Sequence, residues 1–175
     1  MKILCDTRER NPLTFQMLDG VTVESKYLDF GDYACVHNDG TMDKMRFERK
    51  SVADAFSSFS GDNYLNEKRK IARAKTAGSD YSILIEAPLF EVRKGCTFKK
   101  GGEIHEVRKS GIAQIRQLLT ISRKYGIGLQ FFQSRSEMAF YIQEFFLTQE
   151  RLNSKEKSND NDGMDAGNSE KNSGT

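Results

Sequence analysis

The chain has 175 residues, 37% of them hydrophobic, and its 27 Lys and Arg residues against 25 Asp and Glu residues give a formal net charge of +2. This length and composition suit one soluble domain with a buried core. No run of about eighteen apolar residues exists, and the N-terminus leads straight into an apolar strand, so we expect neither a membrane span nor a secretory signal. Three scattered cysteines argue against a structural zinc site and for a reducing environment.

Apolar periodicity predicts alternating strands and helices along most of the chain. Strands are predicted at 2–6, 21–28, 33–37, 45–50, 81–87 and 127–133. Helices are predicted at 53–59, 64–76, 110–125 and 136–149, with a helical turn at 13–18. The basic segment 91–109, between the predicted strand at 81–87 and the predicted helix at 110–125, is expected to be an exposed hairpin or loop. This order indicates an α/β domain whose helices cover both faces of a mixed sheet.

The end of the chain differs in composition from the rest. Residues 150–175 are mostly polar, so we expect a domain over 1–149 followed by a disordered polar tail. The helix at 136–149 carries an aromatic stripe, which belongs either to the core or to a homodimer face.

The segment 31–54 carries the strongest chemical pattern. Asp32 opens one apolar run, Glu48 and Lys50 close the next, and the polar residues 38–40 between them are typical of a hairpin turn. Residues two apart on a strand share a face, so Glu48 and Lys50 point the same way, and the hairpin brings Asp32 near them. Two carboxylates suit Mg²⁺, and a neighbouring lysine can orient or deprotonate a water. The pattern fits a phosphodiesterase site at an exposed sheet edge or, alternatively, a solvated hairpin.

Four short motifs make the chain resemble the XPF-type structure-specific nucleases, a branch of the PD-(D/E)xK restriction-endonuclease-like superfamily. They are CDTRE at 5–9, GD at 31–32 with ERK at 48–50 and an Asp four residues later, GDNY at 61–64, and SILIE at 82–86. The resemblance covers 1–87 well and 111–149 more loosely. It implies a three-layer α/β/α restriction-endonuclease-like fold with a central mixed sheet. The family commonly has an arginine where this chain has residues 62–63.

The resemblance implies a Mg²⁺-dependent DNA endonuclease that cuts branched, flapped or junction DNA during repair or recombination. Asp32 and Glu48 would ligate Mg²⁺ or Mn²⁺, and Lys50 would assist the attacking water. Arg49 would steady either the scissile phosphate or a carboxylate partner.

Two further acids enter the predicted catalytic set through the resemblance, and each has a simpler alternative. Asp54 could act in catalysis or simply be the acid in the first turn of a helix capped by Ser51, and the two roles are compatible. Asp6 could lie beside the metal or only form a turn.

Basic residues on three segments are candidate DNA contacts. They are Arg8, Lys68, Arg69, Arg93, Lys94, Lys99 and Lys100. Arg8 could instead hold a neighbouring carboxylate, and the basic helix that contains Lys68 could simply present a solvated face.

Two other functions compete with the nuclease. One is a non-catalytic DNA-binding or scaffolding member of the same fold, against which the intact ERK triplet argues. The other is a sequence-specific, restriction-like endonuclease, which would cut linear DNA as well as branched DNA. The expected partners are branched DNA and a possible homodimer or partner protein, with no membrane. The expected location is intracellular, in a prokaryotic or viral cytoplasm or nucleoid or in a eukaryotic nucleus.

Overall fold

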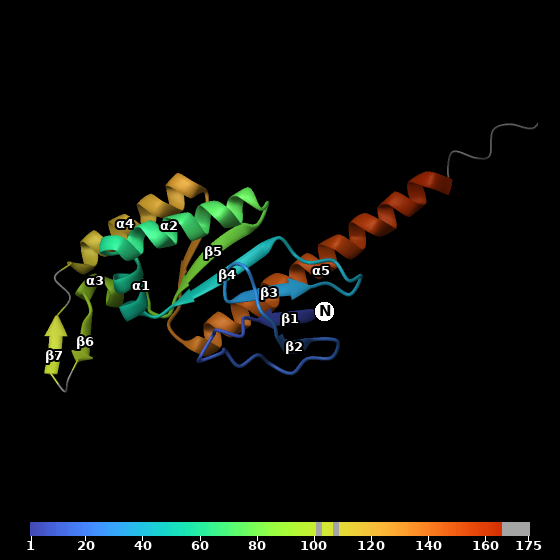
Figure 1. Cartoon of the computed structure of the whole chain (residues 1–175). Coiled ribbons are helices and arrows are strands. Elements are labelled where there is room, and N and C mark those ends of the chain that lie inside the picture. The colour runs from blue at the N-terminus through green and yellow to red at the C-terminus, as the bar shows by residue number, and fades with distance from the viewer. Residues whose placement is uncertain (101–102, 107–108, 166–175) are drawn as a thin grey trace, which may run out of the picture.

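The structure is a computed structural model that describes residues 1–100, 103–106 and 109–165 (Figure 1). Its main sheet has the strand order β2-β1-β3-β4-β5-β8. These strands are β1 Lys2–Cys5, β2 Thr22–Ser25, β3 Tyr33–Val36, β4 Met45–Lys50, β5 Asp80–Ile85 and β8 Gly128–Phe131. Two further strands, β6 Thr97–Lys100 and β7 Glu103–Glu106, form a separate antiparallel hairpin. The basic segment 91–109 therefore contains a hairpin, as predicted, but its first residues, 91–94, belong to a helix in which Val92 is buried.

Helices cover both faces of the main sheet. They are α1 Val52–Ser58, α2 Gly61–Thr76, α3 Leu89–Lys94, α4 Gly111–Tyr125 and α5 Arg135–Asp165. Phe56 of α1, Ile71 of α2 and Ile121 of α4 share one core with Ile83 of β5, whereas α5 packs on the opposite face (Figure 1). The predicted three-layer α/β/α fold with a mixed sheet is confirmed. No helix in the described part of the chain is both long and apolar enough to cross a membrane.

Strand β4 lies inside the sheet. It pairs antiparallel with β3 and parallel with β5, and residue Glu48 stands opposite Ile83. Phe47 points into the core beneath α5, while Glu48 and Lys50 point to the α2 side, as the two-residue period requires. The prediction of an exposed sheet edge is wrong: β5 pairs with the second edge of β4, and the Glu48 side chain, which faces α2, is only 4% exposed.

Two predictions differ from the structure, one for the segment at 13–18 and one for the start of α2. Residues 13–18 form no helical turn, because the backbone N–H of Leu13 donates to the Tyr33 hydroxyl at 2.8 Å and the Phe15 ring packs edge-on against Tyr33. Helix α2 begins at Gly61, so residues 61–63, predicted as a break, form its first turn.

The predicted aromatic stripe of α5 is mainly core. Phe146 and Met138 are buried, and Tyr141 and Phe145 pack against them, which leaves the exposed Phe140 as the outward-facing ring of this set. The structure contains a single chain, so the predicted homodimer stays a prediction.

Helix α5 also continues to Asp165, beyond the predicted end at 149. The prediction of disorder is contradicted over 150–165, where helix-forming residues such as Arg151, Leu152 and Lys155 extend the helix. Glu150 also contacts the buried His37, with Oε2 2.8 Å from Nδ1, so the sequence boundary at 149 cuts a tertiary contact. Residues 166–175 lie outside the described residues.

Candidate active site

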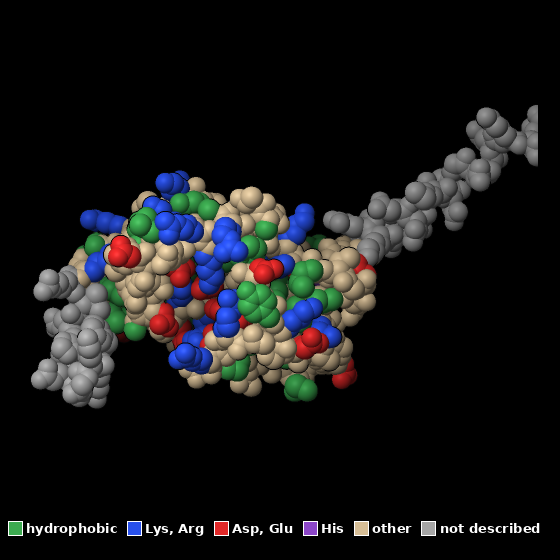
Figure 2. All heavy atoms as spheres, in the orientation of Figure 1, with side chains coloured by type: hydrophobic (Ala, Val, Ile, Leu, Met, Phe, Trp, Pro, Cys, Tyr) green, Lys and Arg blue, Asp and Glu red, His purple; other side chains and the backbone are tan. Residues whose placement is uncertain are grey.

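A cleft of ≈ 330 Å³ opens where the end of β4 and the start of α1 meet the loops at 8–11 and 31–32. Five of the six predicted catalytic residues line it, namely Asp32, Glu48, Arg49, Lys50 and Asp54. Figure 2 shows Lys and Arg side chains around acidic side chains on the face between α2 and the strands. The fold therefore gathers the residues that the sequence pattern grouped.

Asp32 is held in place by its backbone neighbours. Gly31 has φ +73°, and a Cβ at that position would lie 2.9 Å from the carbonyl oxygen of Phe47, so glycine is required there. The backbone N–H of Asp32 donates to the same carbonyl at 2.7 Å, and its Oδ2 accepts from the backbone N–H of Arg49 at 2.8 Å. The carboxylate is thereby fixed against β4.

Glu48 is buried and accepts three hydrogen bonds. Oε1 accepts from Lys50 Nζ at 3.0 Å, while Oε2 accepts from Lys70 Nζ at 2.5 Å and from the Tyr81 hydroxyl at 2.9 Å. Burial alone would raise the pKa of Glu48, but Lys50 and Lys70 hold it below its usual value. Glu48 is therefore a carboxylate at neutral pH.

Lys50 is a buried ammonium between two acids. Its Nζ lies 3.0 Å from Glu48 Oε1 and 3.2 Å from Glu67 Oε1. Burial would lower the pKa of Lys50, but these two carboxylates raise it to about 12. Lys50 is thus a positive charge held between Glu48 and Glu67 at neutral pH.

In the cleft, the partly buried carboxylate of Asp32 lies beside a second carboxylate, that of Glu48. Burial, followed by the negative charge of Glu48, raises the pKa of Asp32 to about 7. Its Oδ1 has no hydrogen bond within the described residues, so one oxygen remains available beside Glu48. A bound cation would relieve the repulsion between these two carboxylates.

The acids in the cleft suit a cation such as Mg²⁺ or Mn²⁺, which needs few protein ligands, better than a metal whose ligands all come from the protein. The described residues contain no group of three or more His, Cys, Asp or Glu side chains arranged for a metal ion. Mg²⁺ commonly uses one or two carboxylates and fills its other positions with water and substrate phosphate. Asp32 and Glu48 meet this requirement, provided that Glu48 shares its oxygens with the neighbouring ammonium groups.

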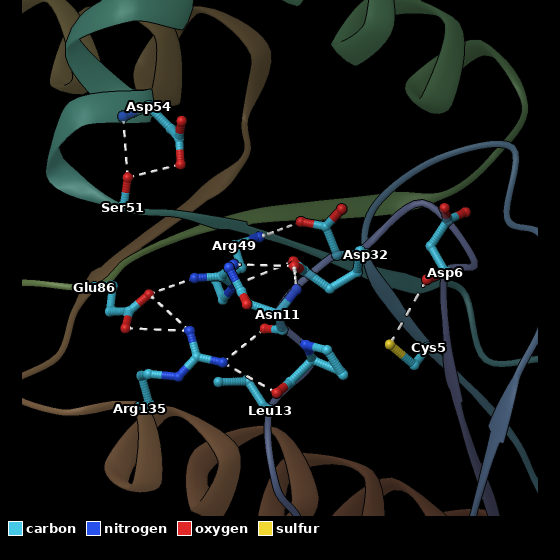
Figure 3. Close-up of polar contacts among 12 residues, drawn as sticks. Cys5, Asp6, Asn11, Leu13, Asp32, Arg49, Ser51, Asp54, Glu86 and Arg135 are labelled. Atoms are coloured by element: carbon cyan, nitrogen blue, oxygen red, sulfur yellow. Dashed lines mark hydrogen bonds and ion pairs between the residues drawn. The ribbon is translucent and has the colours of Figure 1, made fainter. Parts of the chain in front are cut away.

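Arg49 points to the other face of β4, toward α5. Its Nη2 lies 3.0 Å from Glu9 Oε1, its Nε 3.1 Å from Glu9 Oε2, and its Nη1 also bonds Glu86 (Figure 3). Arg135, at the start of α5, binds Glu86 at 3.3 Å and the carbonyl of Asn11 at 2.6 Å. Of the two predicted roles for Arg49, the structure shows the one with carboxylate partners.

Asp54 lies in the first turn of α1 at the wall of the cleft. Its backbone N–H donates to Ser51 Oγ at 3.1 Å, and Ser51 Oγ donates back to Asp54 Oδ2 at 2.6 Å (Figure 3). The predicted cap is confirmed. Because the side chain is exposed and lines the cleft, the cap leaves a role beside the substrate open.

Asp6 does not reach the cleft. Its carboxylate accepts from the Arg8 side chain at 2.8 Å and from the backbone N–H of Leu28 at 2.7 Å, and it lies apart from the Arg49 network in Figure 3. Burial would raise the pKa of Asp6, but the bonds from Arg8 and Leu28 lower it. Of the two predicted roles for Asp6, the structure shows the contacts of the turn-forming one, and the backbone N–H of Asp6 also binds the Asp32 carbonyl at 2.8 Å, while the catalytic role stays a prediction.

The candidate DNA contacts are spread over the molecule. Arg8 lines the cleft and is tied to Asp6, as the alternative reading proposed. Lys68, which stacks on the Tyr64 ring at 4.5 Å, and Arg69 do not line the cleft.

The remaining candidates belong to the segment after β5. Arg93 and Lys94 are exposed in α3, where Lys94 pairs with Glu91 at 2.6 Å. The side chains of Lys99 and Lys100 lie outside the described residues.

Sequence reasoning missed several residues that complete both faces of β4. They are Glu9, Lys70, Tyr81, Glu86 and Arg135. The helical spacing of Glu67 and Lys70, three residues apart on the side of α2 that buries Ile71 and Ala74, was the available signal. No local pattern indicated Tyr81 or Arg135.

Comparisons with known proteins identify the family and the fold. The family model described as the ERCC4 domain matches residues 5–145. The chain has no match among curated proteins. Among solved structures it is similar to XPF from Aeropyrum pernix, at TM-score 0.58 and 21% identity, covering 90% of this chain and 69% of that one. It is also similar to XPF from Aeropyrum pernix in complex with DNA, at TM-score 0.56 and 21% identity, covering 88% and 65%. At this identity the structural likeness establishes the fold.

Proposed function

The chain belongs to the ERCC4 domain family, and from that premise we propose that it is a Mg²⁺- or Mn²⁺-dependent endonuclease for branched, flapped or junction DNA. One observation carries the proposal. Asp32 and Glu48 meet in a cleft beside the buried ammonium of Lys50, and burial and mutual repulsion raise the pKa of Asp32 to about 7. A cation-binding phosphodiesterase site accounts for this costly arrangement. The XPF structure with DNA supports the choice of DNA as the substrate.

Asp32 and Glu48 would hold the cation. When bound, Mg²⁺ or Mn²⁺ would polarise the scissile phosphate and lower the pKa of a coordinated water. Tyr81 and Lys70 orient Glu48 by their hydrogen bonds to its Oε2, at 2.9 Å and 2.5 Å, and Lys50 and Lys70 keep it ionised.

Lys50 supplies a fixed positive charge beside the reacting phosphate. Its ammonium, held between Glu48 and Glu67, would stabilise negative charge that develops on the phosphate oxygens and would orient the attacking water. The exposed Arg8 and Arg10 at the rim of the same cleft would bind neighbouring phosphates.

A cleavage assay on labelled linear, flapped, forked and four-way DNA, with Mg²⁺, Mn²⁺ or EDTA, tests this function. Asp32→Asn is the variant of choice because it keeps the acceptor for the Arg49 N–H and creates no unpaired charge. Glu48→Ala, in contrast, would leave two ammonium groups beside a buried space. Asp19→Asn, an exposed turn residue outside the cleft, is the matched control.

We expect metal-dependent cutting of the branched substrates that Asp32→Asn lowers by about 100-fold or more and that Asp19→Asn leaves unchanged. Cleavage by Asp32→Asn at the wild-type rate would refute the site. Binding of junctions without cutting in any metal would point to a scaffolding protein, and equal cutting of linear DNA to a restriction-like enzyme.

A further inference from the structure

A second hollow, of ≈ 370 Å³, lies beside the cleft. The loop at 26–30 forms one wall, and Met42, Arg46, Ala77 and Ser79 complete it. Pockets that hold small organic groups have volumes of about 300–1,000 Å³, so the hollow could hold a single nucleotide. No part of the proposed chemistry uses this hollow.

Two aromatic rings at the hollow carry stacked guanidinium groups. Arg8 lies 4.7 Å from the centroid of the Tyr27 ring, and Arg73 lies 5.6 Å from that of Phe30. Tyr27 is 60% exposed, so much of its ring is open to solvent. The hydrogen bonds from Arg8 to Asp6 and to the Leu28 carbonyl hold its guanidinium in place over the ring. The platform at Tyr27 is therefore formed before any ligand arrives.

The charge around the hollow is mainly positive. Lys26, Arg46 and Arg73 have no ion pair within the described residues, and Asp29 is the acid among the lining residues. Arg46 donates to the backbone carbonyls of Asp43 and Met45, the latter at 2.8 Å, and the Asp43 carboxylate acts on it without forming an ion pair. An anionic ligand with a flat apolar part matches this combination.

Two sets of residues link the hollow to the candidate active site, one in the N-terminal loops and one on α2. Arg8 lines the cleft and stacks on Tyr27, which lines the hollow. On α2, Lys70 bonds Glu48 in the cleft, while Arg73, one turn later, lies over Phe30. A strand that leaves the cleft would therefore pass between two cation–aromatic pairs.

We propose that this Tyr27 surface, made of Arg8, Lys26, Tyr27, Phe30, Arg46 and Arg73, binds the single-stranded arm of a branched DNA substrate. Unpaired bases stack on exposed aromatic rings, and basic groups follow the phosphates of the same strand. The bases of a duplex are already stacked on one another and cannot use the Tyr27 ring. The proposal rests on the proposed function, because it extends the substrate away from the catalytic cleft.

Binding of labelled oligo(dT) to the full chain in EDTA, measured by fluorescence anisotropy, tests the surface without any cleavage. Tyr27→Ala should weaken oligo(dT) binding about 5-fold or more, whereas Tyr27→Phe should keep it within about 2-fold. Blunt duplex DNA should bind equally well to the wild type and to Tyr27→Ala. The matched control is Phe140→Ala, which removes another exposed ring, on α5 at the opposite side of the sheet.

Arg73→Gln tests the electrostatic part of the surface. It should weaken oligo(dT) binding and reduce the dependence of the affinity on salt, because one phosphate contact is lost. Its control is Arg123→Gln on α4, outside the lining of both cavities. An unfolding midpoint within experimental error of the wild type would show that all these variants are folded.

The results separate this surface from the nuclease proposal. Unchanged oligo(dT) affinity in Tyr27→Ala, or an equal loss in Phe140→Ala, would overturn the surface even if the protein cuts junctions. A selective loss in Tyr27→Ala, in a protein that cuts no DNA with any metal, would support the surface and contradict the nuclease.

Discussion

The buried charges on the two faces of strand β4 differ in whether oppositely charged groups compensate them. On the α5 side, Arg49 is paired with Glu9 and Glu86, so its charge is compensated by two carboxylates. On the α2 side, Glu48 is also paired, but Asp32 next to it is not, and its pKa rises to about 7. Compensated charge indicates a structural network, and unrelieved repulsion indicates a place where a cation or substrate belongs. The difference predicts opposite responses to mutation.

The largest expected effect is a loss of stability on the α5 side. Arg49→Met leaves Glu9 and Glu86 without their shared partner in a site where the Arg49 and Glu9 side chains are 10% and 8% exposed. Breaking a buried ion pair from one side costs about 3–5 kcal/mol, so the free energy of unfolding in urea should fall by that amount. The control Lys2→Met, which breaks the exposed Lys2–Glu24 pair, should cost less than about 1 kcal/mol. Equal stability of the two variants would show that Arg49 is no structural residue.

On the α2 side, removing a charge should instead stabilise the metal-free protein. The folded-state pKa of Asp32, about 7, lies above its ordinary value of 3.8, so the fold favours the protonated acid. Stability from this group is complete below about pH 4, declines as the pH rises, and is lost above about pH 7. Asp32→Asn should therefore match the wild type near pH 4 and exceed it above pH 7 by on the order of 1–3 kcal/mol.

Thermal or urea unfolding in EDTA between pH 4 and 9 would measure this difference, with Asp19→Asn as the control. The opposite trend, with Asp32→Asn less stable at high pH, would mean that Asp32 is stabilised by an undetected positive group. Added Mg²⁺ should raise the stability of the wild type and leave that of Asp32→Asn unchanged.

The smallest expected effect concerns the competition between Lys70 and the cation. Lys70 occupies Glu48 Oε2 at 2.5 Å and is 32% exposed, and Lys70→Met would remove this contact while Lys50 and Tyr81 continue to bond Glu48. We expect Mn²⁺ to bind about 3- to 10-fold more tightly by isothermal titration calorimetry, because one competing positive charge is gone. Lys68→Met on the same helix is the control. Weaker metal binding by Lys70→Met would mean that Lys70 helps to build the site.

Local sequence was sufficient for much of the fold and for the centre of the site. The two-residue period of β4 placed Glu48 and Lys50 on one face, and the hairpin signal at 38–40 brought Asp32 to them. The Ser51 cap could also be predicted from the sequence, because its hydrogen bond with Asp54 joins residues only three apart. The three-layer architecture followed from the alternation of strands and helices, and the family resemblance is confirmed. All these features depend on neighbours a few residues apart or on element order.

Only the tertiary structure decided which groups share the buried space around that centre. Tyr81 reaches Glu48 because β5 pairs in parallel with β4, and Lys70 reaches it because of how α2 is rotated on the sheet. The orientation of Arg49 toward Glu9 and Glu86 likewise brings together loops and strands up to 40 residues apart in sequence. Charge and periodicity are properties of the chain itself, whereas burial and pKa arise when distant segments exclude water from one another. The sequence alone therefore determined which acids and bases are present and which face of β4 carries them, and the packing of α2, β5 and α5 determined which of their charges are compensated and which are not.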